Sequence, residues 1–349
     1  MYGCSGSEKE QGVIWDEKNL VGERMYTDPM LLSRFTQPHI FGEYVVSGSN
    51  SGGYCFTLSK IQSDSIIYNT DFLSRGRGPK EMFIPNLRKH SINGEYFFYD
   101  VNNGLGRIIM TNTDDIRDIH DASNWEELDN IGEIKDVMGL SPLDTNYSSF
   151  LTLMPFGNSS NAMFYKATRD SITPLNFNFP KNELGEENIY ARHIAYTGLL
   201  KKHPEENKYV YFGDQNRHMH IFSFNSDSIK TISEPYTLYP HYILSADGYY
   251  PKFPKEYYTG HHGVVVTKKY IYVLINDTQI QHVGVALPNG LPWDYANTVY
   301  MFDWDGTPIN KLILDVYVYY LFGDMDDQYL YGKNDYVDEQ ATTIYRFKL

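Results

Sequence analysis

Polar side chains, several of them histidines, recur just ahead of the aromatic runs of this sequence, at positions from which they could bind a ligand or a metal. We expect these residues to start strands that line a common axis. Imidazole is a common zinc ligand, so histidines that converge there could hold a divalent metal, with His193, His261 and His262 as its ligands. The complete set of polar residues expected at the axis is His39, Arg88, Asp136, Arg192 or His193, His261 or His262, and Asp315.

No histidine motif of the common metal enzymes supports that metal site. The pair His218 and His220 forms an H-x-H element, but the pattern predicts it on a strand far from the axis. Strand alternation places both side chains on one face, which we expect to be solvated.

A second candidate site is the glycine-rich segment 75–82. Arg75 and Arg77 would offer planar donors to a carboxylate or phosphate, and Glu81 would pair with one of them. The alternative is a structural turn, in which Gly76 and Gly78 permit positive φ and Pro79 fixes the next residue.

A third candidate is the long loop 276–297, since long loops on a rigid scaffold often carry binding residues. Its Trp293 and Tyr295 could stack on a sugar ring or a peptide side chain. The alternative is that both aromatic rings pack the loop onto its own neighbouring strands.

Several function classes find no support. The chain has no G-x-S-x-G element, no reactive cysteine setting and no phosphate-binding G-K-[ST] element. Its net charge is −14, and the nearest approach to a basic cluster is Lys201-Lys202, which we expect at a solvated edge. Nucleic acid is therefore not an expected partner. No apolar run reaches the length of a membrane-spanning helix.

The two cysteines differ in their surroundings. Cys55 lies in an apolar strand pattern and is expected to be an inert core residue. Cys4 directly follows Gly3 and precedes a polar stretch, and the segment Met1-Tyr2-Gly3-Cys4-Ser5 resembles the end of a bacterial lipoprotein signal, where small residues precede the lipidated cysteine. The alternative is an ordinary tail. We therefore expect residues 1–12 to form a tether and the outer membrane to be the address, facing the periplasm or the surface.

The elements that must position these residues repeat along the chain. Aromatic and β-branched runs begin at residues 44, 96, 150, 209, 270 and 329, and a second strand pattern follows each of them. Units of 50 to 60 residues with several short strands match the blades of a β-propeller. The sequence thus predicts an all-β fold over residues 13–349, a single six-bladed propeller with four-stranded antiparallel blades.

The repeat also predicts how the ring closes. The chain ends just after the third strand of the last unit, so the fourth strand must come from the N-terminus, within residues 13–25. Expected inner strands are 87–91, 137–140, 191–196, 263–267 and 316–322. The glycine-rich segment and the 276–297 loop should emerge on one face of such a ring, where the inner strands also start.

The segment 75–82, Arg-Gly-Arg-Gly-Pro-Lys-Glu-Met, resembles the G-x-G-P-x-E-F segment of the TolB-like six-bladed propeller lipoproteins of Bacteroidetes. The resemblance extends to Tyr99-Asp100 and to Arg107-Ile108, and loosely to all the repeats. Lys80 stands where glycine is frequent and Met82 where phenylalanine is frequent. The resemblance implies a cell-envelope protein and no particular activity.

Two functions remain open. The first is a binding or interaction module for a glycan, a peptide or a partner envelope protein, monomeric and without a cofactor. The second is a lyase or hydrolase that uses a divalent metal in the central channel. Three or more polar side chains converging at the axis would favour the second function.

Overall fold

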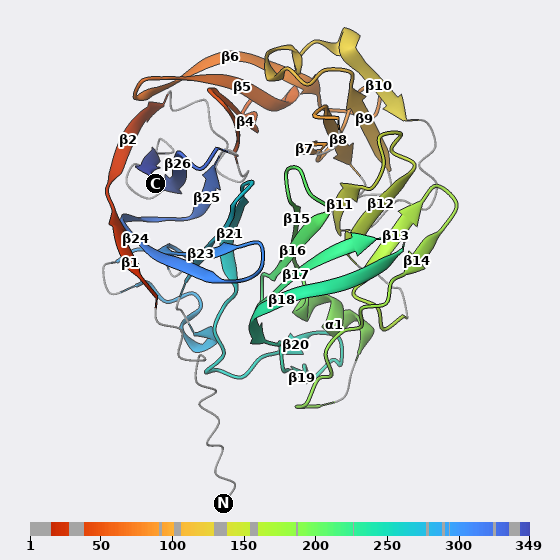
Figure 1. Cartoon of the computed structure of the whole chain (residues 1–349), viewed down its shortest axis with the longest axis vertical. Helices are drawn as coiled ribbons and strands as arrows, with labels where there is room; N and C mark the ends of the chain where they lie inside the picture. Colours follow the sequence, from red (N-terminus) through yellow and green to blue (C-terminus); the bar gives the residue numbers. More distant parts are fainter. Residues whose placement is uncertain are drawn as a thin grey trace, which may run out of the picture.

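The fold is a ring of antiparallel sheets around a central axis (Figure 1). The computed structural model describes residues 15–27, 38–90, 93–100, 106–128, 138–153, 160–185, 188–225, 227–276, 279–287, 290–292, 294–323, 326–334 and 343–349. The expected all-β, propeller-like architecture is confirmed. Among the residues described, no helix is both long and apolar enough to span a membrane.

Consecutive strands pair as antiparallel sets of four, in which the first strand lies nearest the axis (Figure 1). The sets, in chain order, are β3 (His39–Phe41), β4 (Tyr44–Gly48), β5 (Tyr54–Gln62) and β6 (Ser65–Ser74); β7 (Asn86–Lys89), β8 (Tyr96–Asp100), β9 (Arg107–Thr111) and β10 (Trp125–Leu128); β11 (Met138–Pro142), β12 (Ser149–Leu153), β13 (Phe164–Thr168) and β14 (Ile172–Pro174); β15 (Gly198–Lys202), β16 (Lys208–Gly213), β17 (Arg217–Asn225) and β18 (Ser228–Leu238); and β21 (His261–Val266), β22 (Tyr270–Ile275), β23 (Ala296–Asp303) and β24 (Pro308–Val318). The chain ends with β25 (Tyr320–Gly323), β26 (Tyr329–Asn334) and β27 (Thr343–Lys348), and a short pair, β19 (Ile243–Leu244) with β20 (Pro251–Lys252), follows β18.

The predicted aromatic runs are the second strands of these sets, β4, β8, β12, β16, β22 and β26. They are buried on both faces, because each sheet packs against a neighbour on either side. In β8 all five residues are buried. Phe97 on one face of β8 packs with Phe150 of the next sheet, and Phe98 on the other face packs with Phe56 of the preceding one. The core therefore lies between the sheets.

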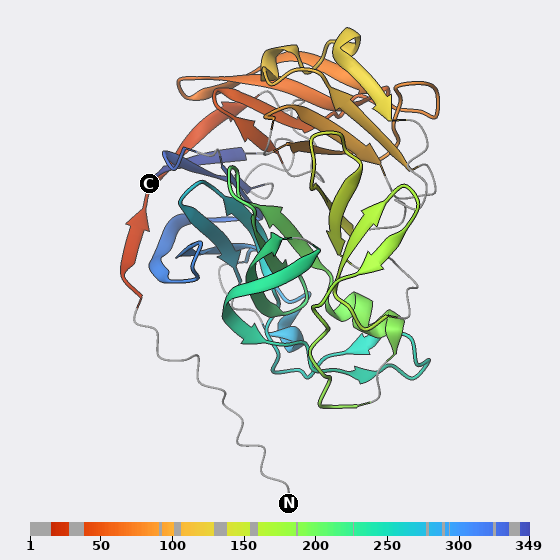
Figure 2. The same ribbon diagram turned by 45° about the vertical axis from the view of Figure 1, so that its right-hand side comes forward.

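The N-terminal strands connect three of the sheets. β1 (Glu17–Leu20) pairs parallel with β24. β2 (Gly22–Thr27) pairs antiparallel with β27 through Gly22–Met25, and then parallel with β6 through Tyr26 and Thr27. Figure 2 shows these red strands on the outside of the blue C-terminal sheets. Residues 22–25 thus lie beside the last strand, inside the segment where the sequence predicts a returning strand.

Two predicted inner strands are wrong. Residues 191–196 belong to the helix α1 (Ile189–Ala195) and its C-terminal cap. The Asn188 side chain caps this helix by accepting hydrogen bonds from two backbone N–H groups, and the alanines that follow favour helix. The inner strand here is β15. Residues 316–322 are divided between β24 and β25, so Asp315 lies exposed on an outer strand, far from its expected place at the axis.

Candidate functional site

The inner strands surround a narrow cavity on the axis, which we call the inner cavity. Its volume is about 160 Å³, and its lining comes from β3, β7, β11, β15, β21 and β25. A larger cavity of about 670 Å³, the outer cavity, opens where the inner strands end. The two cavities adjoin, because both are lined by Ile40, Phe41, Lys89, Lys202 and Val266.

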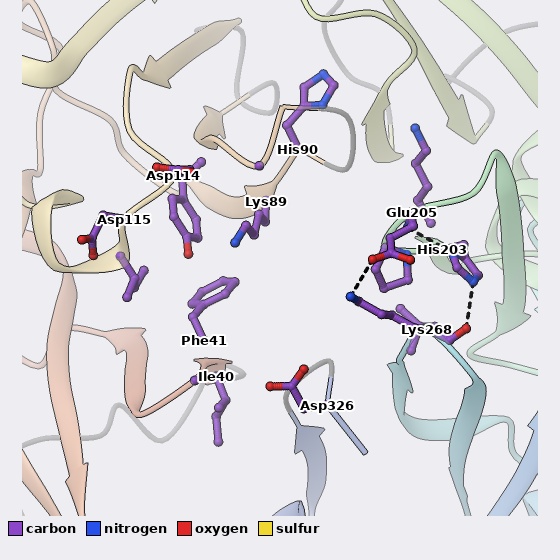
Figure 3. Close-up of a pocket in the computed structure, with 17 residues that line it drawn as sticks. Ile40, Phe41, Lys89, His90, Asp114, Asp115, His203, Glu205, Lys268 and Asp326 are labelled. Carbon is purple, nitrogen blue, oxygen red and sulfur yellow. Dashed lines mark hydrogen bonds and ion pairs between the residues drawn. The ribbon is translucent and has the colours of Figure 1, made fainter. Parts of the chain in front are cut away.

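The outer cavity is lined by both positive and negative side chains (Figure 3). Lys89 points into it from one side, while Glu205 and Lys268 lie across from it with their charged groups 2.5 Å apart. Asp114 and Asp115 add carboxylates, and Phe41 contributes an aromatic wall. A polar ligand that carries both donors and acceptors, such as a sugar or a peptide, matches this lining.

Two histidines at the rim of the outer cavity have structural contacts. His90 Nε2 lies 2.9 Å from the Asp144 carbonyl oxygen, and His203 Nε2 lies 3.0 Å from the Lys268 carbonyl oxygen. Each histidine therefore bonds to the next sheet around the ring. Burial lowers the pKa of both rings, which favours the neutral form.

The inner cavity has a different charge pattern. Arg88, Lys89, Lys201, Lys202 and His39 line it, and its described lining contains no carboxylate. Burial, strengthened by the charge of Arg88, lowers the pKa of Lys201 to about 7. Burial lowers the pKa of Lys202 to about 8 and, with the charges of Arg88 and Lys201, holds that of His39 well below its usual value.

The sequence analysis placed Lys201 and Lys202 wrongly, at a solvated edge. Both are partly buried on β15, because the strand expected at 191–196 is a helix and 198–202 takes the inner position. A signal was present in the sequence: Arg88-Lys89-His90 and Lys201-Lys202-His203 are 113 residues apart, as are Tyr96 and Tyr209. The repeat itself therefore assigns both basic stretches to inner strands. The expected placement of Arg88 and His39 on inner strands holds.

The histidines proposed as metal ligands do not come together. His193 lies buried on α1, and burial together with Arg192 lowers its pKa to about 4. His261 starts β21, where its Nε2 lies 2.8 Å from Asp214 Oδ1, and burial lowers the pKa of the adjacent His262 to about 4. The described residues include no group of three histidine, cysteine, aspartate or glutamate side chains that could hold a metal ion. Asp136 lies outside the described residues.

In the glycine-rich segment, the contacts of Glu81 are those of a structural turn. The Glu81 carboxylate accepts a hydrogen bond from the Gly78 N–H at 2.7 Å, where the sequence suggested an ion pair. A Cβ atom at Gly76 would collide with Oε2 of this carboxylate, so a larger residue there would displace Glu81 from the turn. The expected positive φ at the glycines is wrong, and Lys80 adopts it instead at 54°.

Arg107 of β9 stabilises the same turn through hydrogen bonds to its backbone. Its guanidinium donates to the carbonyl oxygens of Gly78, of Glu81 at 2.8 Å and of Arg77 at 2.9 Å. The Arg75 guanidinium is exposed and donates to backbone carbonyls, including that of Phe83 at 3.2 Å. The Arg77 side chain is exposed.

The long loop after β22 is described in part, and Trp293 lies outside the described residues, as does Cys4. Tyr295 is buried, its ring centre lies 5.8 Å from that of Tyr319, and its carbonyl oxygen accepts from Asn276. Its aromatic ring therefore packs inside the protein, against the connection between β24 and β25, and is not exposed for stacking on a ligand.

The H-x-H pair on β17 is fully buried, so the expectation of a solvated face is wrong. His218 Nε2 lies 3.1 Å from Glu234 Oε1, and His220 Nε2 lies 3.0 Å from Thr231 Oγ1. The His220 ring stacks on Phe177 at 4.2 Å between ring centres. The face of β17 that carries both histidines is covered by residues from the preceding sheet, which strand alternation alone does not reveal.

Comparison with known proteins agrees with this architecture. A family model described as TolB-like 6-blade propeller-like matches residues 47–326. A putative exported protein from Bacteroides fragilis superposes with a TM-score of 0.53 and 11% identity, over 94% of each chain. A gluconolactonase from Xanthomonas campestris gives a TM-score of 0.44 and 10% identity, over 91% of this chain and 88% of that one.

At 11% identity the Bacteroides fragilis structure shows a shared fold and nothing about activity. The comparison with curated proteins found no match. The family match, in contrast, spans most of the chain, including the glycine-rich turn and the inner-strand cations Arg88, Lys89, Lys201 and Lys202. The chain therefore belongs to the TolB-like six-blade propeller-like family.

Proposed function

We propose that this protein is a binding module whose ligand, a glycan, a peptide or a segment of a partner envelope protein, enters the outer cavity. The observation that carries the proposal is the size and lining of that cavity, about 670 Å³ with aromatic, cationic and anionic side chains from several sheets. Cavities of this size with a few convergent polar groups are where small ligands bind.

The scaffold supports this role because it holds the lining rigidly. We infer that the sheets form six blades and that β2 closes the ring by completing the last one. The antiparallel pairing of Gly22–Met25 with β27 supports closure, and the family model describes six blades. Residues contributed by different blades then keep fixed distances from one another.

We further propose a cell-envelope address, with Cys4 as the lipidated residue, 1–12 as the tether and a monomeric propeller beyond it. Gly3 directly before Cys4 and the polar stretch after it support this proposal. The exported relative from Bacteroides fragilis is in keeping with it. Radiolabelled palmitate incorporation that disappears in Cys4→Ser would test the anchor directly, and label retained in that variant would contradict it.

A ligand screen tests the binding proposal. Oligosaccharides and short peptides would be screened by thermal shift, and hits would be titrated by calorimetry against Phe41→Ala, which alters the cavity wall. Ile67→Ala, on the exposed face of β6, is the matched control. We expect Kd to rise at least tenfold in Phe41→Ala and to stay unchanged in Ile67→Ala.

Two results would contradict the proposal. Hits weakened by Arg75→Ala and unaffected by Phe41→Ala would move the site to the glycine-rich turn on the other face. A screen without hits, together with no partner retained from an envelope extract, would remove the support for a binding module.

A further inference from the structure

The inner cavity concentrates positive charge in a protein whose net charge is −14. Arg88 and Lys89 reach it from β7, Lys201 and Lys202 from β15, and His39 from β3. The remaining strands contribute Ser141 and apolar side chains, among them Leu140, Val264, Val265 and Phe322. The basic side chains therefore come from β3, β7 and β15, while β21 and β25 form an apolar side of the inner cavity.

The contacts of these cations do not neutralise them. Lys89 lies over the ring of Tyr96 at 5.1 Å, and Lys202 lies over that of Tyr209 at 5.6 Å. The described residues give Lys201 no hydrogen bond or ion pair, and the Arg88 guanidinium only a long contact of 3.5 Å to the neighbouring Leu87 carbonyl. Basic groups held together without a counter-ion destabilise a folded protein unless they lose protons or a bound anion compensates their charge.

We propose that the inner cavity binds a small oxyanion with two negative charges, a phosphate or a short dicarboxylate, between Arg88 and Lys201. This inference rests on the proposed function, because it assigns an anion subsite at the inner end of the ligand cavity. A volume of about 160 Å³ accommodates a group of this size. The planar Arg88 guanidinium supplies a two-pronged contact, and Lys201 supplies a point charge.

The apolar side of the cavity strengthens this recognition. Val265 and Phe322 are buried, so they limit water near the anion and raise the electrostatic attraction. They also fit a short hydrocarbon segment of a dicarboxylate, whose charged ends would face Arg88 and Lys201. Phosphate and succinate, measured side by side, separate an inorganic from an organic anion.

Anion binding must also take up protons. In the free protein near pH 8 the Lys201 amine is largely neutral, since its pKa is about 7, and a bound anion favours its ammonium form. The groups that face this amine are Arg88, His39, Lys89 and Lys202, all of which are basic. Lys202, with a pKa of about 8, adds to the uptake.

The experiment is calorimetric titration of the full chain with sodium phosphate and with sodium succinate at pH 8, in chloride buffers of different ionisation enthalpy. The variants are Lys201→Met and Arg88→Gln, and the control is Lys230→Gln, an exposed lysine on β18. We expect a saturable site in the wild type and the control. Kd should rise at least about tenfold in either cavity variant, as the loss of one charge-assisted contact implies.

Two further readouts separate recognition from a structural role. The proton uptake of the wild type should shrink in Lys201→Met, and the Tm of that variant in chloride alone should equal or exceed the wild-type Tm, since a buried amine without a hydrogen-bond partner among the described residues is replaced by an apolar side chain. A lower Tm with unchanged anion affinity would assign Lys201 a structural role and overturn the proposal.

The anion subsite and the proposed binding function can fail separately. If neither phosphate nor succinate binds, the anion proposal is overturned, whereas a glycan or peptide that depends on Phe41 would still support the binding module. If the anions bind equally well to Lys201→Met and Arg88→Gln, their site lies elsewhere, and the proposal is likewise overturned.

Discussion

Arg107 shows how one side chain can determine the shape of a loop. It donates to three carbonyl oxygens of the glycine-rich turn and lies 3.3 Å from a carboxylate oxygen of Glu127. The Glu127 carboxylate in turn accepts from the Lys80 N–H. If Arg107 were removed, these partly buried backbone carbonyls would be left without a hydrogen-bond donor. The unpaired carbonyls would account for most of the loss of stability.

We predict that Arg107→Met lowers the free energy of unfolding by about 2–4 kcal/mol, because charge-assisted hydrogen bonds to carbonyls are lost together. Urea unfolding of the wild type and the variant would measure this loss of free energy. Arg117→Met is the control, because Arg117 forms an exposed pair with Asp115 and should change stability little. Equal effects of the two substitutions would show that the hydrogen bonds from Arg107 to the turn stabilise the protein no more than an exposed ion pair does.

Lys80 is one of the two positions at which this chain departs from the family pattern, and its backbone conformation shows why glycine is frequent there. It has a φ of 54°, a left-handed conformation that glycine adopts without strain and that lysine does not favour. The glycine frequent at this position in the family is therefore the residue the backbone favours. In this chain the Lys80 amine donates to the Ala122 carbonyl at 2.9 Å, which offsets part of the strain.

At the scale of elements, β1 and β2 hold together sheets that are far apart in sequence. Leu20 of β1 and Met25 of β2 are buried, whereas Val21 between the two strands is exposed, so the segment packs through a few apolar side chains. The Glu23 carboxylate accepts from the Arg346 guanidinium of β27, and the Gly22 N–H donates to Asp315 at 2.8 Å.

We predict that Met25→Ala lowers the free energy of unfolding by about 2–4 kcal/mol, the usual effect of truncating a buried methionine. Val21→Ala, on the exposed side of the same segment, should leave it nearly unchanged. Chemical unfolding with tyrosine fluorescence measures both. A small effect of Met25→Ala would mean that the N-terminal strand contributes little to closing the ring.

At the scale of the whole molecule, buried histidines make stability depend on pH. Seven of the eleven histidines have a lowered pKa, chiefly through burial: His39, His90, His193, His203, His218, His220 and His262. The folded protein binds protons more weakly than the unfolded chain at these sites. Their contribution to stability is therefore complete above the ordinary histidine pKa near 6.5 and is lost as pH falls below it.

We predict that the free energy of unfolding falls steeply between pH 6.5 and pH 4, by about 1.4 kcal/mol per pH unit for each histidine that stays neutral in the fold. Urea unfolding at pH 7.5, 6 and 5 measures the slope. His220→Phe, which keeps the aromatic stack on Phe177 and removes a group whose pKa is about 3, should flatten it. An unchanged slope in that variant would contradict the assignment of His220 as a buried neutral histidine that contributes to the pH dependence of stability.

The local pattern was enough to predict the second strand of each sheet, although not every inner strand. Tyrosine-rich runs such as Tyr96–Asp100 form a buried second strand because aromatic and β-branched side chains pack on both faces of a sheet, and their even spacing predicts the ring. The glycine-rich turn could also be read locally, although Glu81 and Lys80 use it in ways that the residue types alone do not indicate.

Only the tertiary structure decided which side chains meet. Residues predicted as an inner strand form helix α1, and the inner strand is β15 instead. Lys201 therefore lies at the axis and not at the expected surface edge, together with Arg88 and His39 from sheets distant in sequence. Likewise, His218 and His220 became core residues because the preceding sheet covers their face. Strand propensity is a property of neighbouring residues, whereas burial and electrostatic environment depend on which sheets the ring brings together.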